Sequence, residues 1–302
     1  MADARYSAEL RDLAPSWRRS LRAGNRSPKT IKSYLAALDQ LADHLEDAGR
    51  STAVDQIARS DVESFIGHLL DTRSAATAAT RYRGLQQMFK WAVEEGERDV
   101  SPMEGMHPPR LDSKPVPVVA DDDLRALLKA TEGNGFDDRR DHAILRVFVD
   151  TGARLAEVSG LTVDDVDLDR GLLQVVGKGR KTRVVPVGAR AVRALDRYVR
   201  VRGRHEHAGE ARLWLGLRGP MTDSGIVQMV RRRCRQAGIE EFNVHRFRHG
   251  FAHSWLADGG SERDLMAIAG WESEQMLARY GSSMAAERAQ DAHRRLSPGD
   301  KL

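Results

Sequence analysis

The chain has 302 residues, 41% of them hydrophobic and 30% charged, with a formal net charge of +4. This length suits two domains of about 150 residues each. No apolar run approaches the roughly 18 residues of a membrane span, and the first residues lack the apolar core of a signal peptide, so we expect a globular cytoplasmic protein without a membrane partner. Cys234 is the only cysteine and no Cys/His metal-ligand spacing occurs, so we expect no disulfide, metal or cofactor.

Basic residues gather in two separate stretches. Residues 11–32 hold seven Lys or Arg against Asp12 alone, and residues 171–235 hold 16 against four acidic residues. Either stretch alone is also compatible with a solvated helix face. Together, one in each half of the chain, they suit a protein that contacts a polyanion from two sides. In the first stretch the expected DNA contacts are Arg18, Arg19, Arg22, Lys29 and Lys32.

The first hundred residues show only helical periodicity. Pro15 should kink the first helix or begin its second part. Ser27 followed by Pro28 predicts a clean helix start, and Ser60 with Glu63 predicts a capping box. The expected helices span residues 10–21, 28–48, 61–70 and 76–95, which makes a small helical bundle over residues 1–101.

A proline-rich segment follows this bundle. Five of the ten prolines fall between Pro102 and Pro117. That density opposes helix and central strand, so residues 102–118 are predicted to be an extended linker, with a second domain over residues 119–302.

The second domain is predicted to be mainly helical with a small antiparallel sheet. Residues 172–187 form two β-branched runs joined by Gly-Lys-Gly, the strongest hairpin signal in the chain. Helices are expected from Asp121, over 140–151 with a break at Gly152, over 189–202 and over 223–238. The last of these carries Arg231, Arg232, Arg233 and Arg235, which we interpret as phosphate-backbone contacts.

The segment 245–280 combines the side chains that a small anion would need. His245 and Arg248 lie three residues apart on a helical pattern, so one helix face presents both. Ser261 should cap the next helix and Gly270 should end it, just before Trp271. Tyr280 follows nine residues later. A lone Tyr or His in such a pattern is usually a core or rim residue, so the argument depends on the motifs upstream.

These motifs together resemble the tyrosine recombinases of the phage integrase family. The matching elements are T-G-x-R-x-x-E with Arg154 and Glu157, a hairpin lysine at Lys178, H-x-x-R with His245 and Arg248, a Gly followed by Trp271, and Tyr280. The resemblance covers nearly the whole chain. It implies a helical core-binding domain, an α+β catalytic domain and DNA strand exchange without a cofactor.

The resemblance also implies a role for each matching residue. Arg154 and Arg248 would hold the non-bridging oxygens of a phosphodiester, and Glu157 would support the site without reacting. Tyr280 would attack to give a 3′-phosphotyrosyl intermediate, with Lys178 as general acid and His245 assisting proton transfer. Arg180 and Lys181 in the hairpin are further expected DNA contacts.

Trp271 stands where the commoner family pattern has His. An indole N–H donates a hydrogen bond but cannot accept a proton. We interpret the substitution as favouring a phage or mobile-element integrase over a chromosome-dimer-resolving recombinase. Two competing hypotheses are a type IB topoisomerase, which shares this chemistry, and a catalytically silent DNA-binding regulator.

Assembly is predicted from the same resemblance. The partners would be double-stranded DNA core sites, bound by a homotetramer on two duplexes and by a monomer or weak oligomer without DNA. We expect binding to core sites only, because the residues before Ser27 are too few for the arm-binding domain of the larger integrases, and the sequence indicates no accessory factor. The tail after Tyr280 is predicted to form a helix. The resemblance implies that this helix docks on a neighbouring protomer, and packing on its own domain is the alternative.

Overall fold

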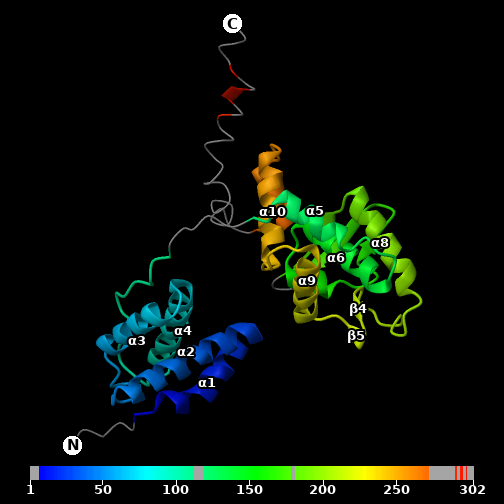
Figure 1. Ribbon diagram of the computed structural model, residues 1–302. Helices are drawn as coiled ribbons and strands as arrows, with labels where there is room; N and C mark the ends of the chain where they lie inside the picture. The colour runs from blue at the N-terminus through cyan, green and yellow to red at the C-terminus, as the bar shows by residue number, and fades with distance from the viewer. Residues whose placement is uncertain are drawn as a thin grey trace, which may run out of the picture. The chain divides into compact units, whose positions relative to one another are not determined.

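The computed structural model describes residues 7–111, 118–177, 181–271, 290, 293–294 and 297. The chain divides into two compact units, Met1–Ser113 and Lys114–Leu302 (Figure 1). Among the described residues it is mainly helical with two small antiparallel sheets, which confirms the predicted fold class.

The first unit is a bundle of four helices. These are α1 (Leu10–Ala23), α2 (Pro28–Asp47), α3 (Arg59–Thr72) and α4 (Ala75–Glu94). Helix α2 packs on both α1 and α4. At the α2–α4 contact a Cβ on Gly84 would stand 3.0 Å from Ala37 Cβ, so the small residues allow the close approach. Trp17, Leu38, Phe65 and Phe89 are among the buried side chains of the core.

Helix starts in this unit follow local chemistry, with two differences from the prediction. Ser27 Oγ accepts from Thr30 N at 3.1 Å, as expected for an N-cap. Pro15, however, lies inside an uninterrupted α1. The predicted capping box at Ser60 is wrong: α3 begins at Arg59, and the Ala58 N–H donates to Asp61 Oδ2 at 2.9 Å.

The predicted linker does not leave the bundle as an extended strand. Ser101 to Met106 form turns, with Glu104 N donating to Ser101 O and Met106 N to Met103 O. Met103 is buried and packs into the core of the first unit. The methionine therefore anchors the beginning of the segment, while residues 112–117 lie outside the described residues.

The second unit combines helices with a three-stranded and a two-stranded sheet. Its helices are α5 (Asp121–Lys129), α6 (Phe136–Thr151), α7 (Leu155–Gly160), α8 (Ala189–Arg202), α9 (Asp223–Ala237), α10 (His245–Ala257) and α11 (Glu262–Ala269). Its strands are β1 (Val166–Asp167), β2 (Leu172–Val176), β3 (Thr182–Pro186), β4 (Leu215–Gly216) and β5 (Gly219–Pro220). Helix α6 starts four residues earlier than predicted, where Asp137 and Asp138 favour a helix N-terminus.

The predicted hairpin is present as β2 and β3, and β1 adds an edge that the sequence did not indicate. The strands pair antiparallel in the order β1-β2-β3, with Leu173 opposite Val185 and Val175 opposite Arg183. Leu173, Val175 and Val185 are buried, whereas their neighbours Val176 and Val184 are exposed. One face of the sheet therefore packs on the core, as a period of two requires.

Helix α6 lies at the centre of this unit, with α10 on one side and α8 on another (Figure 1). Phe148 of α6 stacks on Phe247 of α10 with ring centroids 5.4 Å apart. This contact fixes the helix that carries His245 and Arg248 against the end of α6.

Candidate active site

The turn after α6 brings Arg154 to the start of a short helix. Gly152 ends α6 with φ of 56°, in the left-handed region that favours glycine. A Cβ there would also stand 2.7 Å from the Phe251 ring. The chain then reverses, and the Arg154 N–H donates to Glu157 Oε2 at 2.8 Å, which caps α7.

Glu157 is the anionic centre of the site. Its buried carboxylate accepts from Arg154 Nη1 at 2.9 Å and from Arg183 Nη1 and Nη2, both at 2.8 Å. Burial alone would raise the pKa of Glu157, but the hydrogen bonds from Arg183 and Arg154 outweigh it and lower the pKa to about 2. The carboxylate is therefore ionised and fixes the direction of both guanidiniums.

Arg183 is a site residue that the sequence reasoning missed. It lies on β3, pairs with Glu157 through both terminal nitrogens, and donates from Nε to Ile268 O at 2.9 Å. Its guanidinium also passes within about 3 Å of where a Cβ on Gly270 would stand, and Gly270 has φ of 63°. Arg183 thus ties the sheet and α7 to the end of α11.

Arg248 and Arg154 are both held by backbone carbonyls at helix ends. Arg248 Nη1 donates to Gly152 O at 2.9 Å and Nη2 donates to Ala269 O at 2.6 Å. Arg154 Nη2 donates to Gly270 O at 3.0 Å. The two arginines therefore meet at the ends of α6 and α11, where the helix dipoles favour cations.

The exposure of the two arginines differs. The Arg154 side chain is 37% exposed, whereas Arg248 is 1% exposed. The ring of Trp271, itself buried, lies 5.1 Å from the Arg248 guanidinium carbon. In this state Arg154 is accessible to a ligand and Arg248 is covered.

His245 begins α10 on the same side as these cations. Its backbone N–H donates to Asn243 Oδ1 at 2.9 Å. The loss of water around the ring, followed by the charges of Arg248 and Arg154, lowers the pKa of His245 below 6.5. The neighbouring ring of His249 lies 4.7 Å away, and burial with the His245 charge lowers its pKa to about 4. Both rings are therefore neutral at pH 7.

The structure brings together Arg154, Glu157, His245, Arg248 and Trp271 of the predicted set. Lys178, Arg180 and Tyr280 lie outside the described residues, as does most of the predicted tail helix. The base of the hairpin tip is described: Gly177 N donates to Lys181 O at 2.8 Å, and a Cβ on Gly177 would stand 3.4 Å from Glu157 Oε1. The hairpin that contains position 178 thus leaves the sheet beside Glu157.

The basic residues predicted to contact DNA are mostly at the surface. The exposed ones are Arg18, Arg19, Arg22, Lys29, Lys32, Lys181, Arg231, Arg232 and Arg235. Arg235 and Arg231 pair with Glu241 at 3.2 and 3.7 Å, so part of their charge is already balanced.

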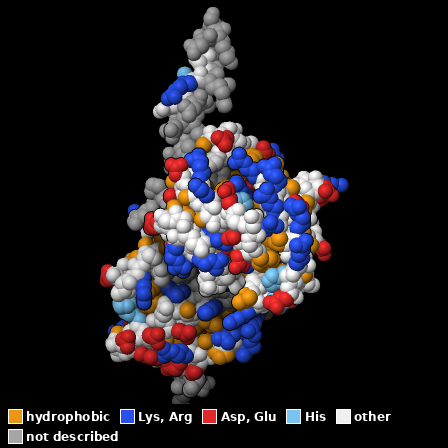
Figure 2. Space-filling view, turned by 45° about the vertical axis from the view of Figure 1, so that its right-hand side comes forward, with side chains coloured by type: hydrophobic (Ala, Val, Ile, Leu, Met, Phe, Trp, Pro, Cys, Tyr) orange, Lys and Arg blue, Asp and Glu red, His pale blue; other side chains and the backbone are white. Residues whose placement is uncertain are grey.

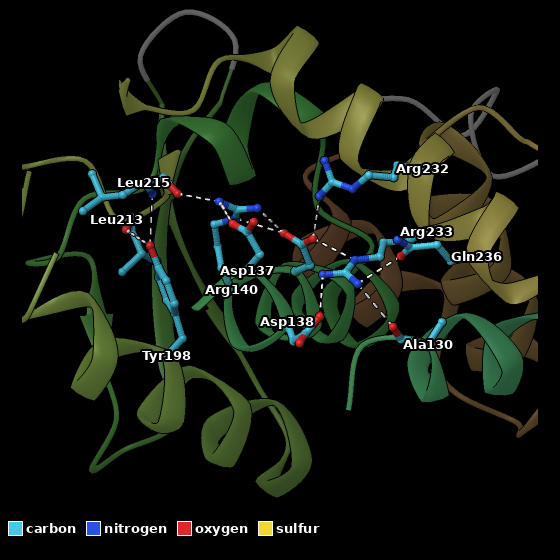
Figure 3. Close-up of polar contacts among 11 residues, drawn as sticks. Ala130, Asp137, Asp138, Arg140, Tyr198, Leu213, Leu215, Arg232, Arg233 and Gln236 are labelled. Carbon is cyan, nitrogen blue, oxygen red and sulfur yellow. Dashed lines mark hydrogen bonds and ion pairs between the residues drawn. The ribbon is translucent and has the colours of Figure 1, made fainter. Parts of the chain in front are cut away.

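Arg233 is the exception, and its assignment as a phosphate contact is wrong. Its side chain is 7% exposed and bonds the fully buried Asp141 through Nε at 2.8 Å. Figure 3 shows Arg140 and Arg232 reaching the same carboxylate, Arg140 through Nη2 at 2.7 Å and Arg232 through Nη2 at 3.0 Å. A second pair joins Arg233 to Asp138 at 2.8 Å. This network fastens α9 to α6 and leaves Arg233 inside the protein.

No cluster of three His, Cys, Asp or Glu side chains suited to a metal ion occurs in residues 7–111, 118–177 and 181–271. Within the described part of the chain, no helix has the length and apolar character needed to cross a membrane.

Comparison with protein families matches both units. The model described as Phage integrase family matches residues 117–287, and that described as Phage integrase, N-terminal SAM-like domain matches residues 16–96. Tyrosine recombinase XerC of Chlorobaculum parvum is 32% identical, over 97% of this chain and 96% of that protein. Tyrosine recombinase XerC of Chromobacterium violaceum is 31% identical, over 83% of each.

Solved structures share the fold. XerH site-specific recombinase bound to palindromic difH substrate, a post-cleavage complex, has a TM-score of 0.74 at 17% identity, covering 94% of this chain and 83% of that one. A lambda integrase dimer bound to a COC′ core site has a TM-score of 0.72 at 16% identity, covering 89% and 97%.

The fold and these matches define an enzyme that recombines DNA: the protein is a tyrosine-type site-specific recombinase. The chain belongs to the phage integrase family.

Proposed function

We propose that this enzyme is a Xer-type recombinase that resolves chromosome dimers in the cytoplasm, by exchanging strands between two copies of one core site. The observation that carries this is end-to-end similarity to curated XerC proteins, up to 97% of this chain and 96% of the relative. The competing proposal, a phage or mobile-element integrase, rests on Trp271. That ring packs over Arg248, and this contact gives no information on which DNA site the enzyme recombines, so Trp271 does not separate the two proposals.

In the proposed reaction Arg154 and Arg248 hold the scissile phosphate. Two guanidiniums stabilise the charge that grows on the non-bridging oxygens at the transition state. The fixed carbonyls of Gly152, Ala269 and Gly270 orient them before DNA binds. Because Arg248 is covered, DNA binding must displace the side chains that lie over it. We propose that the Trp271 side chain is one that moves.

Tyr280 is proposed as the nucleophile, giving a 3′-phosphotyrosyl bond and a free 5′-hydroxyl. A phenol of ordinary pKa near 10 needs a proton acceptor at neutral pH. His245 is neutral because its pKa is lowered, so its ring can accept a hydrogen bond on the side of the phosphate from which the nucleophile attacks. Lys178 is proposed to protonate the leaving 5′-oxygen, and the hairpin base beside Glu157 supports its place at the site.

Strand exchange between two duplexes requires more than one protomer. We propose a homotetramer on two core sites, with the tail after Tyr280 docking on a neighbouring copy. The solved relatives include a lambda integrase tetramer bound to a Holliday junction, which supports the stoichiometry.

The experiment that tests this function is capture of covalent protein–DNA complexes from cells that express the enzyme, followed by sequencing of the attached 3′ ends. We expect the ends to map to one chromosomal locus with two inverted half-sites. Tyr280→Phe, which removes only the hydroxyl, should bind DNA normally and yield no covalent complex. Ends that map to the junctions of an integrated element would overturn the dimer-resolution proposal, and covalent DNA with Tyr280→Phe would overturn the assignment of the nucleophile.

A further inference from the structure

A second basic feature of the catalytic unit lies away from the residues considered so far. It is a groove of about 780 Å³ between α6, α8 and the loop 131–134. Helix α6 contributes Arg139 and Arg146. A row on and just after α8 contributes Arg190, Arg193, Arg197, Arg200 and Arg204. Glu132 is the only acidic side chain among the residues that line the groove. We call this feature the arginine groove.

The arginine groove faces away from the candidate active site. On a helix of 3.6 residues per turn, Arg146 lies about 160° around α6 from Phe148. Phe148 stacks on Phe247 of α10, the helix that carries His245 and Arg248. In Figure 1, α6 lies between α10 and α8, and Figure 2, which turns the α8 side toward the viewer, shows Lys and Arg side chains gathered there. Binding at the active site therefore leaves this surface uncovered.

The positive charge of the groove is poorly balanced within the protein. Among the described residues, Arg200 pairs with Asp196 at 2.8 Å, whereas Arg190, Arg193 and Arg197 form no ion pair within 4.0 Å. Burial, then the charge of Arg190, lowers the pKa of Arg146. A concave surface of one sign with low-dielectric walls concentrates the field, so an anionic ligand would relieve this repulsion.

Hydrogen bonds hold one wall of the groove in place. Thr131 Oγ1 donates to Leu128 O at 2.7 Å and lies 2.9 Å from His142 Nδ1. Because the hydroxyl has one hydrogen, its oxygen accepts from the Nδ1–H of the neutral imidazole. The other ring nitrogen, Nε2, accepts from Arg146 Nε at 3.2 Å. His142, whose pKa burial and Arg146 lower, is therefore a neutral support that orients Arg146 along the groove.

The spacing of the arginines indicates an elongated anionic ligand. Positions 190, 193, 197 and 200 repeat at helical intervals along one face of α8, and ten residues of helix span about 15 Å. One DNA strand advances about 3.4 Å along the duplex axis per nucleotide, and its winding path separates neighbouring phosphates further, so the row is long enough for several successive phosphates. A compact anion would need donors that converge on one point. A row of guanidiniums suits a chain of phosphates.

We propose that the arginine groove binds the phosphate backbone of a DNA segment other than the one held at the active site, such as duplex that flanks the core site. The groove would thereby add sequence-independent affinity and hold flanking DNA against the outside of the catalytic unit. This rests only on the enzyme acting on DNA, and not on its being Xer-type or on Tyr280 being the nucleophile.

The test compares three forms of the full-length protein on a random-sequence 60-bp duplex. The groove variant is Arg193→Gln/Arg197→Gln/Arg200→Gln. The matched control, Arg125→Gln/Arg170→Gln/Arg218→Gln, removes the same charge from exposed positions outside the groove. Binding is measured by fluorescence anisotropy over a range of salt, and melting temperatures establish that both variants fold.

Loss of three phosphate contacts should reduce the slope of log K against log salt by about 3, at roughly 0.9 per contact, and weaken binding at least tenfold at 0.1 M salt. The control should match the wild type. Equal slopes for the groove variant and the control would overturn the proposal.

A photocrosslinking residue at Val201 in the groove gives a direct readout. It should attach to the 60-bp duplex, and the same residue at Leu217, which is exposed outside the groove, should not. Inorganic tripolyphosphate and polyglutamate serve as competitors. Tight binding of either one without any DNA crosslink at Val201 would reassign the groove to a small polyphosphate or an acidic protein and refute the DNA proposal.

Discussion

Replacing Glu157 with Gln should destabilise the catalytic unit by an amount that depends on pH. The substitution keeps the size of the side chain but removes the charge that Arg154 and Arg183 share. The pKa of Glu157 falls from 4.5 to about 2 on folding. At about 1.36 kcal/mol per pH unit, the ionised carboxylate contributes about 3 kcal/mol at neutral pH. This agrees with the cost of about 3 to 5 kcal/mol for breaking a buried ion pair.

The sign of the pH dependence follows from the lowered pKa. The unfolded chain binds the proton of Glu157 before the folded chain does, so the stabilisation is complete above pH 4.5 and is lost as pH falls toward 2. About 1.4 kcal/mol should be gone by pH 3.5. The difference in unfolding free energy between wild type and Glu157→Gln should shrink by that amount.

Differential scanning calorimetry between pH 7 and pH 3.5 measures this effect. For a unit of this size, 3 kcal/mol corresponds to a melting temperature about 6 to 12 °C lower at pH 7. Glu240→Gln, at an exposed position of the same unit, is the control and should change stability by less than about 0.5 kcal/mol. A Glu157→Gln protein that melts like wild type, or a difference that stays constant with pH, would refute the argument.

Three further predictions concern the reaction and its supports. Gly270→Ala forces a side chain into a left-handed residue and against the Arg183 guanidinium, so it should cost about 1 to 2 kcal/mol and slow cleavage, as urea unfolding and a cleavage assay would detect. Lys178→Ala should cleave a 5′-bridging phosphorothioate at near wild-type rate because sulfur leaves without protonation; equal impairment on oxygen and sulfur substrates would rule out a general acid. Since Arg248 helps to lower the pKa of His245, the acid limb of the cleavage rate should lie below pH 6.5, and an acid limb above pH 6.5 would contradict this.

The sequence predicted best the features that depend on a few neighbouring residues. Ser27 and Ser261 cap their helices through hydrogen bonds three residues ahead, and Gly152 and Gly270 end theirs in the left-handed conformation. Each of these choices is decided by local backbone chemistry. At α3 the N-cap is Ala58 rather than Ser60, and the residue three positions on that accepts its N–H is Asp61 rather than Glu63.

Features that depend on distant residues were not predictable in the same way. A lone arginine on a strand gives no indication that it will meet Glu157, 26 residues earlier. Arg233 looks like its exposed neighbours, and only the fold places Asp141 beside it, 92 residues away. Pro15 is tolerated inside α1 because Leu13 and Trp17 are buried on either side of it. Packing outweighed the missing N–H.

The carbonyls that hold Arg248 and Arg154 also couple the opening of α11 to the end of α6 and the start of α7. Gly152 O at the end of α6 and Ala269 O at the end of α11 are joined through the same guanidinium, although they lie more than 100 residues apart in the chain. Local unfolding of α11 must therefore release Arg248 and, through Gly270 O, Arg154 as well. In amide hydrogen exchange, α11 and the first turn of α7 should open as one cooperative group, so exchange protection of α11 would report directly on whether the arginine pair is assembled.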